Sequence, residues 1–372
     1  MALFPVAIIT LYLKKDLGMT MEDIMLLQAI FSTIVCLLEF PGGYIGDRIG
    51  YKTSLMVGLC INLVGWTTYS LATSFWEVAL AQTILATGLT FITGCDQAMI
   101  YESLKSANKV QEYPLWNKRY IITGQTAESL AALTAGILYA HWAQLPLIIE
   151  VGIYFIGIGL AVFLHEPSKD SKRQHISLND MRHVVVDSLG TNQALKWILL
   201  ISALFSLATY YPVWIVQLYA DAKGVPSKWL GFIWAFANFM VIVGAGISHR
   251  VQSKVGLRNT LYLCIGLLLM GYGGLGMSEG AFGVGFYFII TLLRGINFTL
   301  LTEKIQELAN SESRASVLSL RSFLVRGCFA ISAPAIGWWM DQKGFNPVLI
   351  TLGILFAGGL ALLLKMSNKK QA

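Results

Sequence analysis

The sequence predicts an all-α membrane protein built as two bundles of six helices. Of its 372 residues, 55% are hydrophobic and only 13% are charged, about half the charged fraction of a soluble domain. The apolar residues gather in runs long enough to cross a bilayer, which takes about 20 residues per helix. The two halves of the chain also match each other in sequence, which indicates an internal repeat.

The apolar runs give the individual helices. The start, residues 1–14, is apolar but has neither the basic residues nor the small-residue cleavage site of a signal peptide, so we interpret it as a short first helix. The other predicted spans are 22–46, 52–72, 75–104, 115–140, 146–164, 194–219, 227–251, 258–277, 281–307, 314–340 and 346–364. Together with the start they make twelve.

One long polar connection divides the spans six and six. Residues 165–193 form this predicted cytoplasmic linker, between an N-terminal bundle over residues 1–164 and a C-terminal bundle over residues 194–364. Residues 365–372 are a short polar tail.

The basic residues give the topology. Of the 27 Lys and Arg residues, 20 fall in the even-numbered connections and the tail, and only 5 fall in the odd-numbered connections. Because cytoplasmic loops are enriched in Lys and Arg, we expect both termini in the cytoplasm. This count assigns Arg321 to a cytoplasmic connection. The basic residues of the cytoplasmic connections thus account for the net charge of +6. We therefore expect no nucleic-acid partner.

The repeat relates the first two helices of each half. Residues 4–6 match residues 211–213, Gly18 matches Gly224, and residues 49–55 match residues 255–261. Such repeats are related by an axis along the membrane normal. The run at 194–219 has 18 residues before Pro212, whereas the start has four before Pro5. The first span would cover about 21 Å of a core about 30 Å thick, so we expect translation to begin upstream.

A charged stretch between the second and third spans is the most specific pattern in the sequence. Residues 43–52 carry Asp47, Arg48 and Lys52 together with Gly43 and Gly50. Charges are costly at bilayer depth, and glycine permits tight turns. We therefore predict a short cytoplasmic loop between two helices.

The pattern G-x-x-x-D-R-x-G-x-K in this stretch resembles the signature loop of the major facilitator superfamily of secondary transporters, with Tyr51 where an arginine is usual. Residues 38–41 and 313–320 resemble pieces of a bacterial branch of that superfamily. The resemblance implies two six-helix bundles around a central cavity, in a bacterial inner membrane. The run at 82–84 lacks the arginine of many drug and proton antiporters, and 134–136 lacks their Gly-Pro pair, which disfavours multidrug export.

The resemblance also implies that the loop latches a gate. Glu102 is the expected partner of Arg48, and Asp47 would favour the start of the eleventh helix near Arg314 through the helix dipole. A static loop that only follows the charge rule is the alternative.

Acids within the spans are candidates for proton coupling. Asp96 lies about 12 Å from the inner end of the span at 75–104, and Glu128 has a similar place in the next span. An acid at such depth can carry a proton between the two faces, or it can form a permanent salt bridge.

Polar groups in the C-terminal half are candidates for solute binding. Arg294 and Arg326 stand near mid-depth, and a guanidinium there needs an anion, either an acid from the other half or an anionic or zwitterionic solute. Asn297 lies one turn from Arg294 and can bind the same ligand. Aromatic and polar candidates for the cavity lining are Tyr210, Tyr211, Trp214, Trp234 and Asn238.

Other chemistry finds no support. The five cysteines stand singly in apolar runs and no histidines cluster, so we expect no metal. There is no phosphate-binding loop and no nucleophile at a suitable spacing from a general base. We therefore expect that the protein does not use ATP, holds no cofactor and is not an enzyme.

The resemblance and the buried charges together imply a monomeric secondary transporter that moves a small organic solute by alternating access, with protons as the coupling ion. A drug-like, siderophore-like or anionic solute fits, and efflux and uptake both stay open. The alternative is a membrane sensor or scaffold of the same fold that transports nothing.

Overall fold

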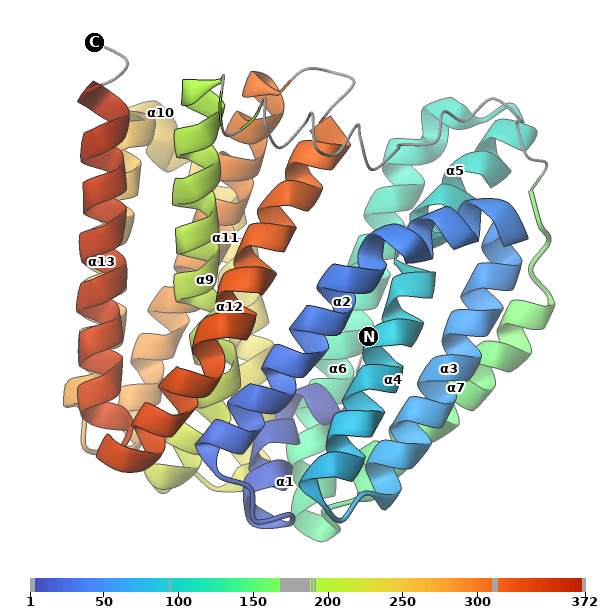
Figure 1. The fold of residues 1–372 in the computed structure, drawn as a ribbon, viewed down its shortest axis with the longest axis horizontal. Coiled ribbons are helices and arrows are strands. Elements are labelled where there is room, and N and C mark those ends of the chain that lie inside the picture. Colours follow the sequence, from blue (N-terminus) through green and yellow to red (C-terminus); the bar gives the residue numbers. More distant parts are fainter. Residues whose placement is uncertain are drawn as a thin grey trace. The chain divides into compact units, whose positions relative to one another are not determined.

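The computed structural model describes residues 4–93, 95–167, 188, 190, 192–309 and 314–369, without the side chains of residues 39–47, 315, 368 and 369. These residues form α-helices and short 3-10 helices, and no strand occurs among them (Figure 1). The predicted all-α class is therefore confirmed. The chain divides into two compact units, residues 1–175 with 227–232, and residues 176–226 with 233–372.

The first unit packs around two neighbouring helices, α3 and α4. It contains η1 (Pro5–Ala7), α1 (Ile9–Lys15), α2 (Met21–Ile49), α3 (Tyr51–Leu71), α4 (Phe75–Ile92), α5 (Cys95–Ser106), η2 (Val110–Glu112), α6 (Tyr113–His141), α7 (Leu145–Val162) and η4 (Ser227–Trp229). Helix α3 packs against α4 and α7, and α2 packs against α4 (Figure 1). Local signals start these helices: Ser74 and Glu77 form a capping box at α4, and a proline opens α6 and α7.

The second unit packs around α9. It contains α9 (Gln193–Ala222), most of α10 (Leu230–Met277), η5 (Ala281–Val284), α11 (Gly285–Leu308), α12 (Arg314–Lys343) and α13 (Phe345–Lys369). The green helix α9 contacts α11, α12 and α13 (Figure 1). Its first turn is capped by Asn192, whose side-chain oxygen accepts a hydrogen bond from the Leu195 amide at 3.0 Å.

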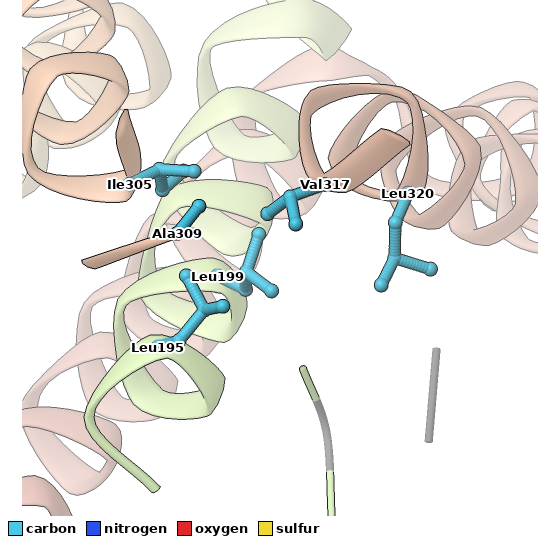
Figure 2. Packing of buried hydrophobic residues seen from close by; sticks show 6 residues of the cluster. All are labelled: Leu195, Leu199, Ile305, Ala309, Val317 and Leu320. Atoms are coloured by element: carbon cyan, nitrogen blue, oxygen red, sulfur yellow. The ribbon is translucent and has the colours of Figure 1, made fainter. Parts of the chain in front are cut away.

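An apolar cluster joins α9, α11 and α12 near one end of each helix (Figure 2). Its members are at most 8% exposed and are Leu195, Leu199, Ile305, Ala309, Val317 and Leu320. Because Leu320 is the residue before Arg321, this packing fixes the part of α12 from which that arginine extends.

The connection between α2 and α3 differs from the predicted loop. Helix α2 continues to Ile49 and α3 begins at Tyr51, so Gly50 alone separates them. The prediction of a loop over residues 43–52 is wrong, because charged residues at a solvated helix end can stay helical, and a basic residue in the last turn suits the helix dipole. Only Gly50, with φ of 107°, needs the freedom of glycine.

Matched glycines of the repeat adopt matched conformations. Gly256 divides α10 with φ of 81° and ψ of 158°, and Gly50 has φ of 107° and ψ of 149°. Gly18 and Gly224 also share positive φ, at 67° and 79°. The correspondence that the sequence predicts at these positions is therefore present in the backbone.

The predicted span 75–104 is broken. Helix α4 ends at Ile92, Thr93 has an extended backbone with φ of −61° and ψ of 123°, and α5 begins at Cys95. Among the described residues, nine helical segments are long and apolar enough to cross a membrane. These count α4 with α5 as one and the whole of α10 as one, and they omit α6 and the short α1. Twelve spans are reached only if α10 is divided at Gly256 and α1 and α6 are added.

Candidate functional site

A cavity of about 220 Å³ lies in the second unit, lined by three helices. Helix α9 supplies Phe205, Ser206, Thr209 and Tyr210, α11 supplies Arg294, Asn297 and Phe298, and α12 supplies Arg321, Ser322, Val325 and Arg326. The lining thus combines three guanidinium groups with neutral hydrogen-bonding groups and aromatic rings. It contains no Asp or Glu among the residues that the structure describes.

Arg321 is the most firmly held of the three arginines. It is 8% exposed, its Nη1 donates to Thr302 Oγ1 at 2.8 Å, and its Nη2 donates to Ser206 Oγ at 2.9 Å. Its guanidinium carbon lies 5.1 Å from the centre of the Phe298 ring. These neutral partners orient the guanidinium and tie α12 to α11 and α9. They do not neutralise its charge, because hydroxyl groups carry none.

The other two arginines are more accessible. Arg294 is exposed and Arg326 is half-buried. Within the described part of the chain, none of the three arginines forms an ion pair with a carboxylate. Three positive charges therefore converge on one small cavity, and their summed field attracts anions.

Asn297 belongs to the lining of the same cavity, and its amide is buried. Its side chain is 3% exposed, and neither Nδ2 nor Oδ1 has a hydrogen-bond partner among the described residues. The Cys264 thiol lies beside it, but the pair does not reach hydrogen-bonding geometry. Buried amides without partners are rare because each group loses its hydration, and both atoms of this amide have almost no accessible surface.

The predicted aromatic candidates separate into two sets. Tyr210 lines the cavity. Trp214 packs edge-on against the Tyr210 ring, with the two ring centres 6.1 Å apart. Tyr211 is fully buried instead, shares a 2.5 Å hydrogen bond with Ser332 Oγ, and packs against Phe329.

Two more of the predicted binding residues, Trp234 and Asn238, are half-buried on α10 and do not belong to the cavity lining. Of the residues predicted for solute binding or for the cavity lining, the cavity therefore brings together Tyr210, Arg294, Asn297 and Arg326.

The two acids predicted for proton coupling have different surroundings in the first unit. Asp96 lies in the first turn of α5, where its carboxylate accepts hydrogen bonds from the Tyr120 hydroxyl and, at 2.7 Å, from the Gln97 amide. Its position at a helix start replaces the predicted position inside a continuous span. Glu128 lies within α6 and is 4% exposed.

A match over most of the sequence gives the family. A sequence model described as Major Facilitator Superfamily matches residues 1–330. The chain belongs to the Major Facilitator Superfamily. This is a family of membrane transporters rather than enzymes, so the chain is an integral, multi-pass membrane protein.

Two curated relatives are similar over part of their length. The uncharacterized MFS-type transporter YxaM of Bacillus subtilis is 24% identical over 238 residues, which are 62% of this chain and 58% of the relative. The fosmidomycin resistance protein of Escherichia coli is 24% identical over 262 residues, which are 67% of this chain and 61% of the relative. The chain thus spans about three fifths of the length of these relatives.

Solved structures show the same fold. A crystal structure of the nucleoside transporter NupG superposes with a TM-score of 0.79 at 14% identity, covering 98% of this chain and 94% of NupG. A POT family transporter in complex with 5-aminolevulinic acid gives a TM-score of 0.70 at 14% identity, with 98% and 92% covered. Major facilitator folds are therefore shared across very different sequences.

The predicted gate residues of this major facilitator chain are partly described. Gly43 lies within α2, and the side chain of Asp47 lies outside the described residues. Arg48 and Arg314 are exposed at helix ends, and Glu102 is 8% exposed and lies 4.0 Å from Lys105 Nζ. The pairing of Arg48 with Glu102 stays a prediction.

A carboxylate that the sequence did not reveal holds the start of α3. Glu166 accepts hydrogen bonds from the Tyr51 amide at 2.7 Å and the Lys52 amide at 2.8 Å. The Lys52 ammonium in turn donates to the Val162 carbonyl at 2.8 Å. These contacts tie the end of α7 to the start of α3, directly after Gly50.

Arg321 is the other residue that sequence reasoning missed. The count of loop charges placed it in a cytoplasmic connection, whereas the structure places it in α12 at the cavity. Its position inside the predicted span 314–340, five residues before Arg326, was the available signal.

Proposed function

We propose that this major facilitator protein is a secondary active transporter that moves a small organic anion by alternating access, coupled to protons, in a bacterial inner membrane with both termini cytoplasmic. The observation that carries the proposal is the convergence of Arg294, Arg321 and Arg326 on one cavity without a carboxylate among the described lining residues. A guanidinium keeps its charge at physiological pH and binds carboxylate and phosphate groups well.

The burial of Arg321 supports transport over the scaffold alternative. Removing a charge from water costs several kcal/mol, and replacement of buried charges by well-packed apolar residues often stabilises a protein. A protein that needed only a stable bundle would gain from an apolar residue at this position. An anionic solute that visits the cavity offsets the cost of burying the Arg321 charge.

Proton coupling is proposed for the acids of the first unit. Ionisable residues within membrane spans commonly form proton relays, and Glu128 and Asp96 are the candidates. One curated relative is named for resistance to fosmidomycin, which supports a small-molecule solute.

Transport in proteoliposomes tests the proposal. The purified chain would be given an imposed pH gradient and a panel of radiolabelled organic anions, with size-matched neutral and cationic solutes for comparison. We expect gradient-driven transport of an anion by the wild type and its loss in Arg321→Gln and Arg326→Gln. Arg250→Gln, an exposed arginine outside the cavity lining, is the matched control and should transport normally.

The coupling ion is tested by Glu128→Gln and Asp96→Asn in the same vesicles. A coupling residue should lose gradient-driven accumulation while still exchanging labelled for unlabelled solute. Transport that ignores the pH gradient in the wild type would overturn proton coupling, and transport of neutral and cationic solutes as fast as anions would overturn the anion proposal.

A further inference from the structure

The accessible polar groups of the cavity lining are mainly hydrogen-bond donors. Arg294 is exposed and Arg326 is half-buried, and neither guanidinium forms an ion pair within the described part of the chain. The half-buried Tyr210 and Ser322 add two hydroxyl groups to the same lining. A solute group with several acceptor oxygens and no donor of its own suits such a lining.

The Ser206 hydroxyl has a proton left to donate. Its Oγ accepts a hydrogen bond from Arg321 Nη2 at 2.9 Å, and a hydroxyl that accepts one hydrogen bond can still donate another. Thr302 accepts from Arg321 Nη1 in the same way, at 2.8 Å. Ser206 belongs to the cavity lining and Thr302 does not. Ser206 can therefore contact a solute in the cavity, while Thr302 only holds the arginine.

The number of positive charges favours an acid with two negative charges. At the same distance, such an acid is attracted twice as strongly as one with a single charge. Arg294, Arg321 and Arg326 bring three charges, and no Asp or Glu lines the cavity in the described part of the chain. A singly charged acid would leave two of them uncompensated, which is costly within a membrane. A phosphate monoester carries about two charges at neutral pH and presents three strong acceptor oxygens.

We infer that the solute is an organic phosphate or phosphonate monoester. The three arginines attract its doubly charged acid, and Ser206 donates to one of the acid's oxygens. The exposed ring of Phe298 and the half-buried ring of Tyr210 offer aromatic surface to the organic part. The inference rests on the proposed function and adds the class of acid that the site selects.

A matched pair of esters tests the inference directly. The full chain in phosphatidylcholine nanodiscs would be titrated calorimetrically with phenyl phosphate and with phenyl sulfate. Both have the same ring, ester oxygen and three terminal oxygens, but at neutral pH the phosphate carries about two charges and the sulfate one. We expect the wild type to bind phenyl phosphate at least about tenfold more tightly than phenyl sulfate. Inorganic phosphate, which has no ring, should bind more weakly than phenyl phosphate.

A lower pH removes the charge difference between the two esters. About one unit below the second pKa of about 6, a phosphate monoester carries close to one charge, whereas the arginines keep theirs. The lining contains no Asp, Glu or His among the described residues. The ratio of the two affinities should fall about five- to tenfold between pH 7.5 and pH 5, while the affinity for phenyl sulfate stays the same.

Variants assign the selectivity to the named groups. Arg326→Gln should lower the ratio of the two affinities, and Arg250→Gln, at an exposed arginine outside the lining, should keep it. Ser206→Ala should weaken phenyl phosphate binding more than Thr302→Val does, because each removes one partner of Arg321 but only Ser206 lines the cavity. Equal losses in these two variants would overturn the contact between Ser206 and the solute.

The outcomes separate the inference from the function beneath it. If phenyl sulfate binds as tightly as phenyl phosphate, if the ratio does not change with pH, or if inorganic phosphate binds as tightly as phenyl phosphate, the inference is wrong while the anion transporter stands. The same holds if neither ester binds but the proteoliposomes transport another organic anion. If no anion binds and none is transported, the proposed function fails as well. The wild-type comparison needs no variant, so poor folding of a variant would not block the test.

Discussion

Arg321 on α12 donates to the Ser206 hydroxyl on α9 at 2.9 Å, and its other terminal nitrogen donates to Thr302 on α11 at 2.8 Å. One side chain therefore joins the three helices that line the cavity. A planar guanidinium can hold two partners in a set geometry, whereas an ammonium is a compact point charge. The arginine thus orients its charge as well as supplying it.

Arg321→Lys should keep the charge but lose that orientation. We expect the Kd for the bound anion to rise about tenfold, which corresponds to about 1.4 kcal/mol, because a lysine cannot hold Ser206 and Thr302 together while facing the solute. Calorimetric titration of the purified protein measures the change. Arg326→Lys is the comparison, since no such tether is present at that position in the described residues, and its loss should be smaller. Equal losses in both would contradict the orienting role.

Asn297→Leu should stabilise the protein. A buried polar group without a partner costs about 1–3 kcal/mol, and leucine has a similar size and no polar atom. We expect the melting temperature in detergent, without solute, to rise by a few degrees. Asn62→Leu is the control and should not raise the melting temperature. Asn62 is also buried, at 2% exposure, but its amide is not among the unsatisfied groups. A lower melting temperature for Asn297→Leu would show that its amide is already satisfied.

Residue types and depth were sufficient to predict part of the cavity. Arg294, Asn297 and Arg326 were expected there because polar groups inside an apolar run need a partner or a ligand. Arg321 was missed because the ends of a span are blurred in hydropathy, and a shift of two turns moves a residue from loop to membrane. Tyr210 and Tyr211 show a second limit. Adjacent helical residues point about 100° apart, and composition does not say which of the two faces the cavity.

Contacts between segments that are distant in the sequence are the other part of the structure that the sequence does not predict. The apolar runs predict most of the helices, and the repeat pairs Gly50 with Gly256 from the sequence alone. Nothing in the sequence near Tyr51 points to Glu166, which is 115 residues away along the chain. Its role as the partner of the α3 start depends on how α7 packs against α3, which is a property of the fold rather than of either segment.

Removing the Glu166 charge should loosen the start of α3. A carboxylate that accepts two backbone N–H groups at a helix start satisfies donors that otherwise lack partners and suits the helix dipole. We expect Glu166→Gln to lower the melting temperature by a few degrees at low salt and by less at high salt, since the charge-dependent share is screened. Glu303→Gln, an exposed acid 3.6 Å from His249, is the control and should have little effect. If Glu303→Gln lowers the melting temperature as much as Glu166→Gln does, the hydrogen bonds from Glu166 to the start of α3 do not stabilise the protein more than an ordinary surface ion pair.

The two matched glycines give the sharpest test of this junction. Both have positive φ, so alanine at either position is strained, by about 1–3 kcal/mol. A Cβ at Gly50 would also lie 2.9 Å from Glu166 Oε2, whereas a Cβ at Gly256 would meet nothing within 4 Å. Gly50→Ala should therefore lower the melting temperature more than Gly256→Ala, and the double variant Gly50→Ala with Glu166→Ala should cost less than the sum of the two single changes, because the clash is then absent. The melting temperatures of the three single variants and the double variant measure this coupling. Equal effects at the two glycines, with additive behaviour in the double variant, would mean that Glu166 moves aside without cost and that backbone strain alone sets the requirement for glycine.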